Sequence, residues 1–332
     1  MWHKRVFFPV GQGGFAVERI GDYTVAFDCG SSTSLGLVES WIDLLTRHYV
    51  NRIDVLFISH FDHDHVNSIR YLLNNVKVRK TVTSMIPKEL KTAYSIYTNG
   101  AYNAIMTLLR ENNMETDEVG GEENGILSIQ HNDIWEWVAK SMMSVAEFER
   151  IKAKMVEMGL DVTRLDEAEY LEKEKKNVNK AFRAVFGTKG PNAKGLIMLS
   201  QKSKNVLVSG CEIVGNFCLN PNSIGVFEDS SCLYVGDADL RNLANKADVK
   251  SFIHKNKTED ELLMMQIPHH GSQNNRGVGF ETDFPARLYF VNDVDTKRLQ
   301  KNLGLLSSLT RQRKLFVLSD RVRDIMMGFT KI

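Results

Sequence analysis

Ser59-His60-Phe61-Asp62-His63-Asp64-His65 places five metal-binding side chains within six residues, directly after a mostly apolar segment at 53–58. An apolar run of that length predicts a buried strand. In the extended loop after it, positions 60 and 62 project to one side, while 64 and 65, at the start of the next helix, reach a second point. Two ligand pairs aimed at two points suit a dinuclear metal centre. The alternative is a polar loop that caps a helix, but a cap needs only one Asp or Ser.

A second apolar strand, at 232–235, ends in Gly236-Asp237. Gly236 lets the backbone turn closely, and the carboxylate of Asp237 can bridge two cations and lower their mutual repulsion. The alternative for Asp237 is an ordinary turn residue, since Gly-Asp is common in turns. We predict the bridging role because other strands of this chain also end in metal-binding residues.

A third apolar run, at 262–267, continues into Pro268-His269-His270-Gly271-Ser272. Adjacent histidines point in different directions, so one can bind metal while the other faces the substrate. We assign His269 to the metal and His270 to substrate binding or proton transfer, with Asp64 as a second catalytic residue. The same argument would also allow the reverse assignment, with His270 as the metal ligand and His269 facing the substrate. Strands that all finish in ligands imply that their ends converge at one edge of a sheet sandwich.

The chain is predicted to be one domain, 1–332, with an inserted segment at about 88–186. This segment has helical periodicity and dense charge, so we expect it to be mostly helical. Strand-like runs lie before it and return after it. A surface helix has to bury its apolar face, and we expect the inserted helices to do so beside the metal cleft or against a partner protein.

The composition is that of an ordinary globular protein, with 43% hydrophobic and 25% charged residues. Lys and Arg number 42 and Asp and Glu 41, so no net positive field attracts nucleic acid to the whole molecule. A nucleic-acid substrate would need a local basic strip, for which 77–80 and 311–314 are the candidates. Four cysteines without C-x-x-C spacing, no signal-peptide pattern and no bilayer-spanning apolar run predict a soluble, cytoplasmic protein.

The motifs at these strand ends resemble those of the metallo-β-lactamase superfamily, and most closely those of the hydrolase domain of ComEC-type competence proteins. The resemblance rests on 9–14 (Pro-Val-Gly-Gln-Gly-Gly), 27–30 (Phe-Asp-Cys-Gly), 59–65, 234–237 and 269–272. Most of the superfamily carries His-x-His-x-Asp-His, whereas the ComEC-type branch carries His-x-Asp-x-Asp-His, as this chain does with Asp62. The branch often has Asp after Gly-Gln-Gly, where this chain has Gly14. The resemblance implies an α/β protein with the αββα sandwich of metallo-β-lactamases.

The resemblance also implies a ligand set and its supporting residues. Two divalent metal ions, Zn or Mn, would be held by His60, Asp62, Asp64, His65, Asp237 and His269. Most superfamily members supply one further His before the bridging Asp, and in its place the ComEC-type branch has an Asn-containing stretch. Asn192 and Asn222 are both candidates for that stretch. Asp28 and Ser272 are expected to orient ligands or water by hydrogen bonds.

The residues alone predict metal-assisted hydrolysis of an ester or amide. The resemblance implies a nuclease or phosphodiesterase that acts on DNA. A second hypothesis is a hydrolase of a small-molecule ester, lactone or cyclic nucleotide. A third, from another class, is a non-catalytic interaction protein with a structural metal site, in which the helical insertion binds a protein partner. None of these hypotheses requires a membrane.

Overall fold

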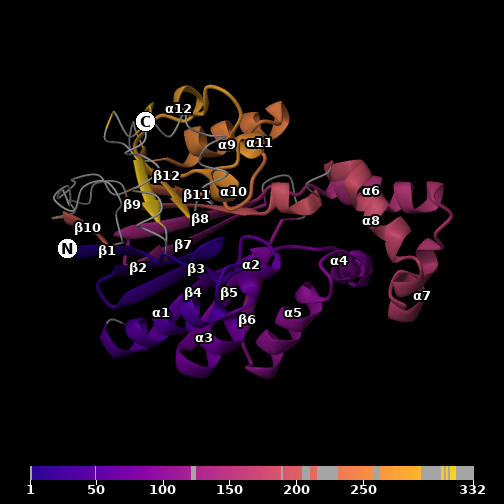
Figure 1. Ribbon diagram of the computed structural model, residues 1–332, viewed down its shortest axis with the longest axis horizontal. Helices are drawn as coiled ribbons and strands as arrows, with labels where there is room; N and C mark the ends of the chain where they lie inside the picture. The colour runs from indigo at the N-terminus through magenta and orange to yellow at the C-terminus, as the bar shows by residue number, and fades with distance from the viewer. Residues whose placement is uncertain are drawn as a thin grey trace.

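The structure is a computed structural model that describes residues 2–48, 50–120, 125–187, 190–203, 210–214, 231–257, 262–292, 308–309, 312 and 315–318. Within these ranges the chain forms two seven-stranded sheets that pack against each other, with helices over the outer faces (Figure 1). This layering confirms the αββα sandwich predicted from the sequence. No helix in the described part of the chain is long and apolar enough to cross a membrane.

The first sheet delivers the loop that carries the His and Asp motif. Its strands are β1 (Trp2–Phe7), β2 (Gly13–Ile20), β3 (Tyr23–Ser31), β4 (Arg52–Phe57), β5 (Lys77–Ser84), β6 (Glu115–Val119) and β10 (Gly210–Val214). Their order across the sheet is β10-β1-β2-β3-β4-β5-β6. Strands β3 to β6 run parallel, so the ends of β3 and β4 that carry Asp28 and Ser59 lie at the same edge.

The second sheet delivers the other two ligand segments. Its strands are β7 (Ile126–His131), β8 (Trp135–Ser141), β9 (Leu196–Lys202), β11 (Cys232–Tyr234), β12 (Leu262–Gln266), β13 (Ala286–Asn292) and β14 (Leu315–Leu318). Their order is β14-β13-β12-β11-β9-β8-β7. Strands β11 and β12 are parallel neighbours, with Cys232 opposite Met264. Their carboxyl ends therefore bring Asp237 and the two adjacent histidines to one edge.

Helices cover both sheets (Figure 1). On the first sheet lie α1 (Leu35–His48), α2 (His63–Val66), α3 (Ile69–Asn75) and α5 (Ala101–Glu111). On the second lie α9 (Leu243–Asn256), α10 (Pro268–Gly271), α11 (Gln273–Arg276) and α12 (Phe280–Asp283). A further group projects at one end of the molecule and consists of α6 (Val145–Glu157), α7 (Ala168–Lys173) and α8 (Lys175–Phe186). Helix α4 (Lys91–Tyr97) joins this group to α5, and short 3₁₀ turns are η1 (Lys88–Leu90), η2 (Val162–Arg164) and η3 (Gly190–Lys194).

Three strands lie inside the range expected to be a helical insertion. β6, β7 and β8 fall within 88–186 and belong to the two sheets. In β8 the side chains of Trp135, Trp137 and Ala139 are buried, which is the period-two pattern of a strand. The strands are not predicted because this alternation is short, whereas the dense charge of the whole range favours exposed helices. The helices of this range are α4 and α5 before these strands and α6, α7 and α8 after them.

A buried ion pair lies among the apolar side chains between the two sheets. Arg5 Nε lies 2.5 Å from Glu18 Oε1, and both side chains are buried. Glu18 also accepts hydrogen bonds from the Tyr234 hydroxyl at 2.7 Å and the Trp137 indole at 3.0 Å. Burial opposes ionisation of Glu18, but Arg5, His3 and the hydrogen bonds from Ser200 and Tyr234 lower its pKa to about 2. Beside the pair, burial and Arg5 lower the pKa of His3 to about 3.

Candidate metal centre

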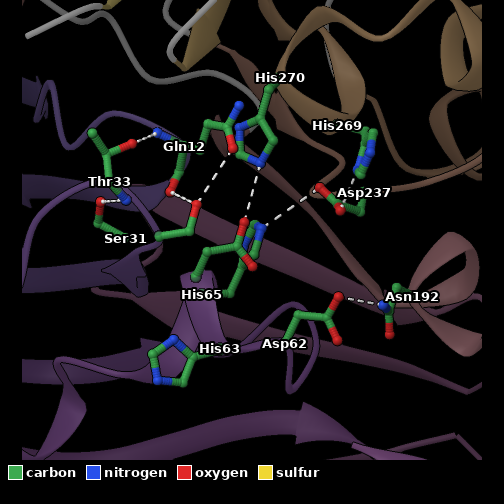
Figure 2. A network of polar contacts seen from close by, with 12 residues as sticks. Gln12, Ser31, Thr33, Asp62, His63, His65, Asn192, Asp237, His269 and His270 are labelled. Carbon is green, nitrogen blue, oxygen red and sulfur yellow. Dashed lines mark hydrogen bonds and ion pairs between the residues drawn. The ribbon is translucent and has the colours of Figure 1, made fainter. Parts of the chain in front are cut away.

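Four segments that are distant in the sequence meet at one edge of the sandwich (Figure 2). The loop after β4 and helix α2 bring His60, Asp62, Asp64 and His65, the turn after β11 brings Asp237, and α10 after β12 brings His269 and His270. The fourth segment, η3, precedes β9 and brings Asn192. The convergence of strand ends expected from the sequence thus places these side chains around a common centre.

Asp28 and Ser59 fix the orientation of the two buried histidines. Ser59 donates to Asp28 through both its backbone N–H and its hydroxyl, each at 2.7 Å. The hydroxyl has only one proton, so at 2.9 Å from His60 Nδ1 it accepts a hydrogen bond from the ring. His65 Nδ1 lies 2.8 Å from the Asp28 carboxylate and donates to it. Both rings therefore turn their Nε2 atoms away from Asp28, toward the centre of the site.

The two Nε2 atoms fit a metal ion. His60 is 3% exposed and His65 is 1% exposed, and neither Nε2 has a hydrogen-bond partner within the described chain. A buried polar atom without a partner is costly, and a ligated cation removes that cost. Burial and the neighbouring His65 lower the pKa of His60, which keeps its Nε2 lone pair available. Burial opposes protonation of His65, but Asp28 and Asp237 raise its pKa, and a cation between His65 and Asp237 would replace that proton.

Asp237 faces both histidines with different oxygens. Its Oδ2 lies 3.8 Å from His60 Nε2, and its Oδ1 lies 3.5 Å from His65 Nε2. Burial opposes ionisation of the carboxyl, but the hydrogen bond with His269 and the nearby His65 ring hold its pKa well below the usual value. The backbone that carries it is fixed by Gln266, whose side-chain oxygen accepts from the Val235 and Gly236 amides. One ionised carboxylate with an oxygen toward each histidine is the geometry of a bridging ligand.

Two groups of three side chains, which share His65, could each hold a metal ion. In each group one ligand atom per residue lies within 4.8 Å of the others, and the groups are His60, His65 and Asp237, and Asp64, His65 and His270. His270 Nε2 lies 3.4 Å from Asp64 Oδ2. Burial opposes ionisation of Asp64, but His270 and His65 lower its pKa. The described residues thus offer two adjacent positions for a cation, with His65 between them.

Asp62 forms the open side of the site. Its Oδ2 lies 4.0 Å from His60 Nε2, and its side chain is 38% exposed, against 2% for His60. Asn192 donates a hydrogen bond to the same oxygen (Figure 2). Asn192 therefore approaches the site through Asp62, whereas Asn222 lies outside the described residues.

The two adjacent histidines occupy different places. His270 is 6% exposed and lies with Asp64 and His65. His269 has a side chain that is 37% exposed, and its Nδ1 lies 2.5 Å from Asp237 Oδ2. Both residues have positive φ, 48° and 52°, a conformation that is rare outside Gly and signals a local constraint. The turn after Pro268 thus sends one ring into the site and the other to its rim.

The remaining motif residues lie around the site. His63 is exposed and its Nδ1 meets the Asn67 amide at 2.9 Å. Ser272 contributes backbone contacts, with its N–H donating to the His269 carbonyl at 2.9 Å. Asn275, which the sequence does not single out, donates to the Asp237 carbonyl at 2.9 Å. Gly14 packs on the Asp28 and His65 pair, where a Cβ atom would lie 3.0 Å from Asp28, so a larger residue there would press on the ligand support.

Comparisons with solved structures give low-identity similarity to metallo-β-lactamase proteins. A subclass B3 metallo-β-lactamase from a soil metagenome library matches over 100% of this chain and 95% of its own, with 10% identity and a TM-score of 0.39. A metallo-β-lactamase from Novosphingobium pentaromativorans matches over 98% and 88%, with 9% identity and a TM-score of 0.37. The chemotaxis sensor ODP, in a peroxy-diiron form, matches over 42% of this chain and 48% of its own, with 17% identity and a TM-score of 0.29. No protein-family model and no curated protein matches the chain.

Proposed function

We propose that this chain is a metal-dependent hydrolase of phosphodiesters, with DNA as its substrate. One observation carries the proposal: the partnerless Nε2 atoms of His60 and His65 face the two oxygens of Asp237. This arrangement calls for cations in two adjacent positions. Two divalent ions would supply Lewis acidity for the phosphoryl oxygens and lower the pKa of a water molecule.

The geometry supports a ligand assignment that exchanges the two adjacent histidines. We propose that one ion is held by His60, Asp62 and Asp237, and the other by Asp64, His65, His270 and Asp237. His269, at the rim and 2.5 Å from Asp237, then transfers a proton between the site and solvent. The chain's own contribution is to bind the phosphodiester beside Asp62, hold the carboxylates ionised and provide this proton path.

An open rim favours catalysis over a structural metal site. Structural sites are closed by protein ligands, whereas catalytic sites keep a position for water or substrate. Here the ligand Asp62 and the rim residue His269 are 38% and 37% exposed and Asp64 is 23% exposed, whereas the other ligands, His60, His65, Asp237 and His270, are buried. The exposed rim also argues against the hypothesis of a non-catalytic interaction protein, in which the metal ion would only stabilise the fold.

The choice of a phosphodiester rests on the ligand chemistry and on the sequence motifs. Three carboxylates and three histidines, His60, His65 and His270, give the site more oxygen donors than most of the superfamily, and oxygen donors suit Mn²⁺ as well as Zn²⁺. The His-x-Asp-x-Asp-His motif resembles that of ComEC-type hydrolase domains, which supports DNA. A small ester, lactone or cyclic nucleotide is the alternative substrate class.

Purified protein reconstituted with Mn²⁺ or Zn²⁺ tests the proposal on a chromogenic phosphodiester, linear duplex DNA and single-stranded DNA, beside a chromogenic carboxylic ester. We expect hydrolysis of the phosphodiesters, with elemental analysis giving close to two ions per chain. Asp237→Ala should lower bound metal and abolish hydrolysis with an unchanged circular dichroism spectrum, while Asp239→Ala, two residues away, should retain both. Faster hydrolysis of the carboxylic ester than of any phosphodiester would favour the small-molecule alternative.

A further inference from the structure

Helix α8 carries an exposed row of cations on the face opposite its buried one. Its sequence, KKNVNKAFRAVF, contains no acidic residue, and Val178, Ala181 and Phe182 are buried. Lys176, Lys180 and Arg183 are exposed, and their spacing of four and three places them on one helix face, over about 10 Å of the axis. We call Lys176, Lys180 and Arg183 the α8 stripe.

The α8 stripe differs from other basic surfaces of the chain because acids do not neutralise it. At 77–80, Lys80 pairs with Asp117 at 2.6 Å and with Glu115 at 3.0 Å, and Arg79 lies 3.3 Å from Asp54. Within the described chain, Lys176 and Lys180 have no carboxylate at ion-pair distance. The strip expected at 311–314 lies outside the described residues except for Gln312.

Helix α6, beside α8 in the same group, shows the contrast most directly. Its Lys152 lies 2.6 Å from Glu149, and its Lys154 lies 2.5 Å from Glu157. The side chains of Lys152 and Lys154 are 26% and 40% exposed, and their ion pairs bring the net charge of this surface to zero. A positive field thus belongs to α8 specifically and not to the projecting helices as a group.

The α8 stripe ends beside the open side of the metal site. The Tyr97 hydroxyl packs closely on Gly190 of η3. Burial and then Asp62 raise the pKa of this hydroxyl, and Arg183 lowers it, so Tyr97 lies near both charged groups. α8 also contacts η3, which carries Asn192, the donor to Asp62. The acidic residues Glu169 and Glu172 on the preceding helix α7, and Glu174 at the N-terminal end of α8, all lie on the Lys176 side of the stripe in sequence, away from Arg183.

Tyr97 adds an aromatic surface at this end. Its ring is half-buried against Phe182, with centroids 5.0 Å apart. A positive track with an aromatic ring beside it is the arrangement that binds single-stranded nucleic acid, because the cations follow the phosphates and the ring stacks on a base. Here Tyr97 is near both Arg183 of the stripe and Asp62, the most exposed of the proposed ligands.

We propose that the α8 stripe seats the phosphate backbone of single-stranded nucleic acid and, with Tyr97, leads it to the metal site past Asp62. This inference rests on the proposed function and assigns to the inserted helices the binding of substrate outside the scissile bond. The stripe should increase affinity for nucleic acid of any base sequence, since contacts with phosphates do not distinguish one base from another.

The test measures binding by fluorescence anisotropy of labelled single-stranded DNA with a phosphorothioate backbone, which keeps the charge and slows cleavage. Lys176→Gln/Lys180→Gln removes two cations from the stripe, and Lys152→Gln/Lys154→Gln is the matched control on α6. We expect the stripe variant to raise Kd about tenfold or more at low salt and to reduce the slope of log Kd against log salt by about 1.4, or 0.7 per lost contact. The control variant should change neither quantity.

A separate measurement distinguishes this inference from the proposed function. If the wild-type protein binds the strand and hydrolyses no phosphodiester, the proposed function fails, and the binding comparison still decides whether the stripe is a nucleic-acid surface. Equal Kd and equal salt slope in the stripe variant and the wild type would overturn the inference. Tighter binding of duplex than of single-stranded DNA would overturn its choice of a single strand.

Discussion

The hydroxyl of Ser59 donates to Asp28 at 2.7 Å and thereby decides which nitrogen of His60 faces the metal site. Because that hydroxyl donates its only proton to Asp28, it accepts a hydrogen bond from His60 Nδ1. The Nε2 atom of His60 is therefore directed at Asp237. Asp28 does the same for His65 directly. One serine and one carboxylate therefore orient both buried histidines.

Replacing Ser59 tests this relationship. Ser59→Ala removes the acceptor for His60 Nδ1 without touching any proposed ligand, and loss of such an orienting contact weakens metal binding by roughly 10- to 100-fold. We expect that loss in a metal titration followed by calorimetry, with little change in the melting temperature of the metal-free protein. Ser40→Ala, on the exposed face of α1, is the control. Equal metal affinity in Ser59→Ala and wild type would show that the serine does not orient the ring.

Substitution of the two adjacent histidines should have different effects on metal content and on kcat. His270→Ala removes a proposed ligand beside Asp64 and His65, so we expect loss of about one metal ion per chain by elemental analysis. His269→Ala removes a rim residue, so we expect metal content to persist while kcat falls by roughly 10²- to 10⁴-fold, the range for a lost proton-transfer group. If His269→Ala loses metal and His270→Ala retains it, the assignment made from the sequence would stand and the exchange would be wrong.

The strand-end motifs could be predicted from the sequence because each directly follows an apolar run. A strand that ends in Asp237 or in the 59–65 segment places its ligands at a sheet edge whatever the details of packing. Asp28 also emerged as an orienting residue, and the structure places it against His65 at 2.8 Å. The αββα layering, implied by the resemblance, is confirmed.

What could not be predicted depends on contacts between distant segments. Ser59 lies within the motif, but its role depends on Asp28, 31 residues away. The two candidate asparagines are alike in sequence, and only the packing of η3 shows that Asn192 reaches Asp62. In the basic segment at 77–80, Arg79 and Lys80 pair with acids of neighbouring strands, such as Asp117 on β6, and no local sequence pattern reveals these pairs.

Because His3 is buried and its pKa is lowered, we expect the folded protein to lose stability in mild acid. Its pKa is about 3 in the folded chain and 6.5 in the unfolded chain, so below pH 6.5 only the unfolded state takes up the proton. Folding stability then falls by up to about 1.4 kcal/mol per pH unit. Glu18, with a folded pKa of about 2 against 4.5 unfolded, adds to this loss only below about pH 4.5.

Urea unfolding between pH 7 and 4.5 measures the contribution of His3. His3→Phe keeps a ring against Trp135, 4.2 Å away, and removes the titrating group, so we expect its stability to fall by about 2 kcal/mol less than that of the wild type over this range. His254→Phe, at an exposed position of α9, should follow the wild type. Parallel curves for His3→Phe and wild type would mean that His3 is protonated in the folded protein at these pH values.

In the motif that resembles that of the metallo-β-lactamase superfamily, Asp62 stands where most members have an imidazole, and we expect this position to set the metal preference. Carboxylate ligands suit harder ions such as Mn²⁺, whereas imidazole favours Zn²⁺, although the general affinity order favours zinc at nearly any such site. Metal found after purification therefore says little, and activity has to be compared. We expect Mn²⁺ to support hydrolysis at least as well as Zn²⁺ in the wild type.

Asp62→His should move that preference toward zinc, because it replaces the carboxylate, whose Oδ2 lies 4.0 Å from His60 Nε2, with an imidazole nitrogen donor and leaves the other ligands in place. Metal-free protein would be reconstituted with each ion in turn, and hydrolysis of one phosphodiester compared. Asp62→Asn is the matched control, since it removes the charge without adding an imidazole and should lower both activities without favouring zinc. A Mn²⁺ to Zn²⁺ activity ratio that is the same in Asp62→His and wild type would show that another ligand sets the preference.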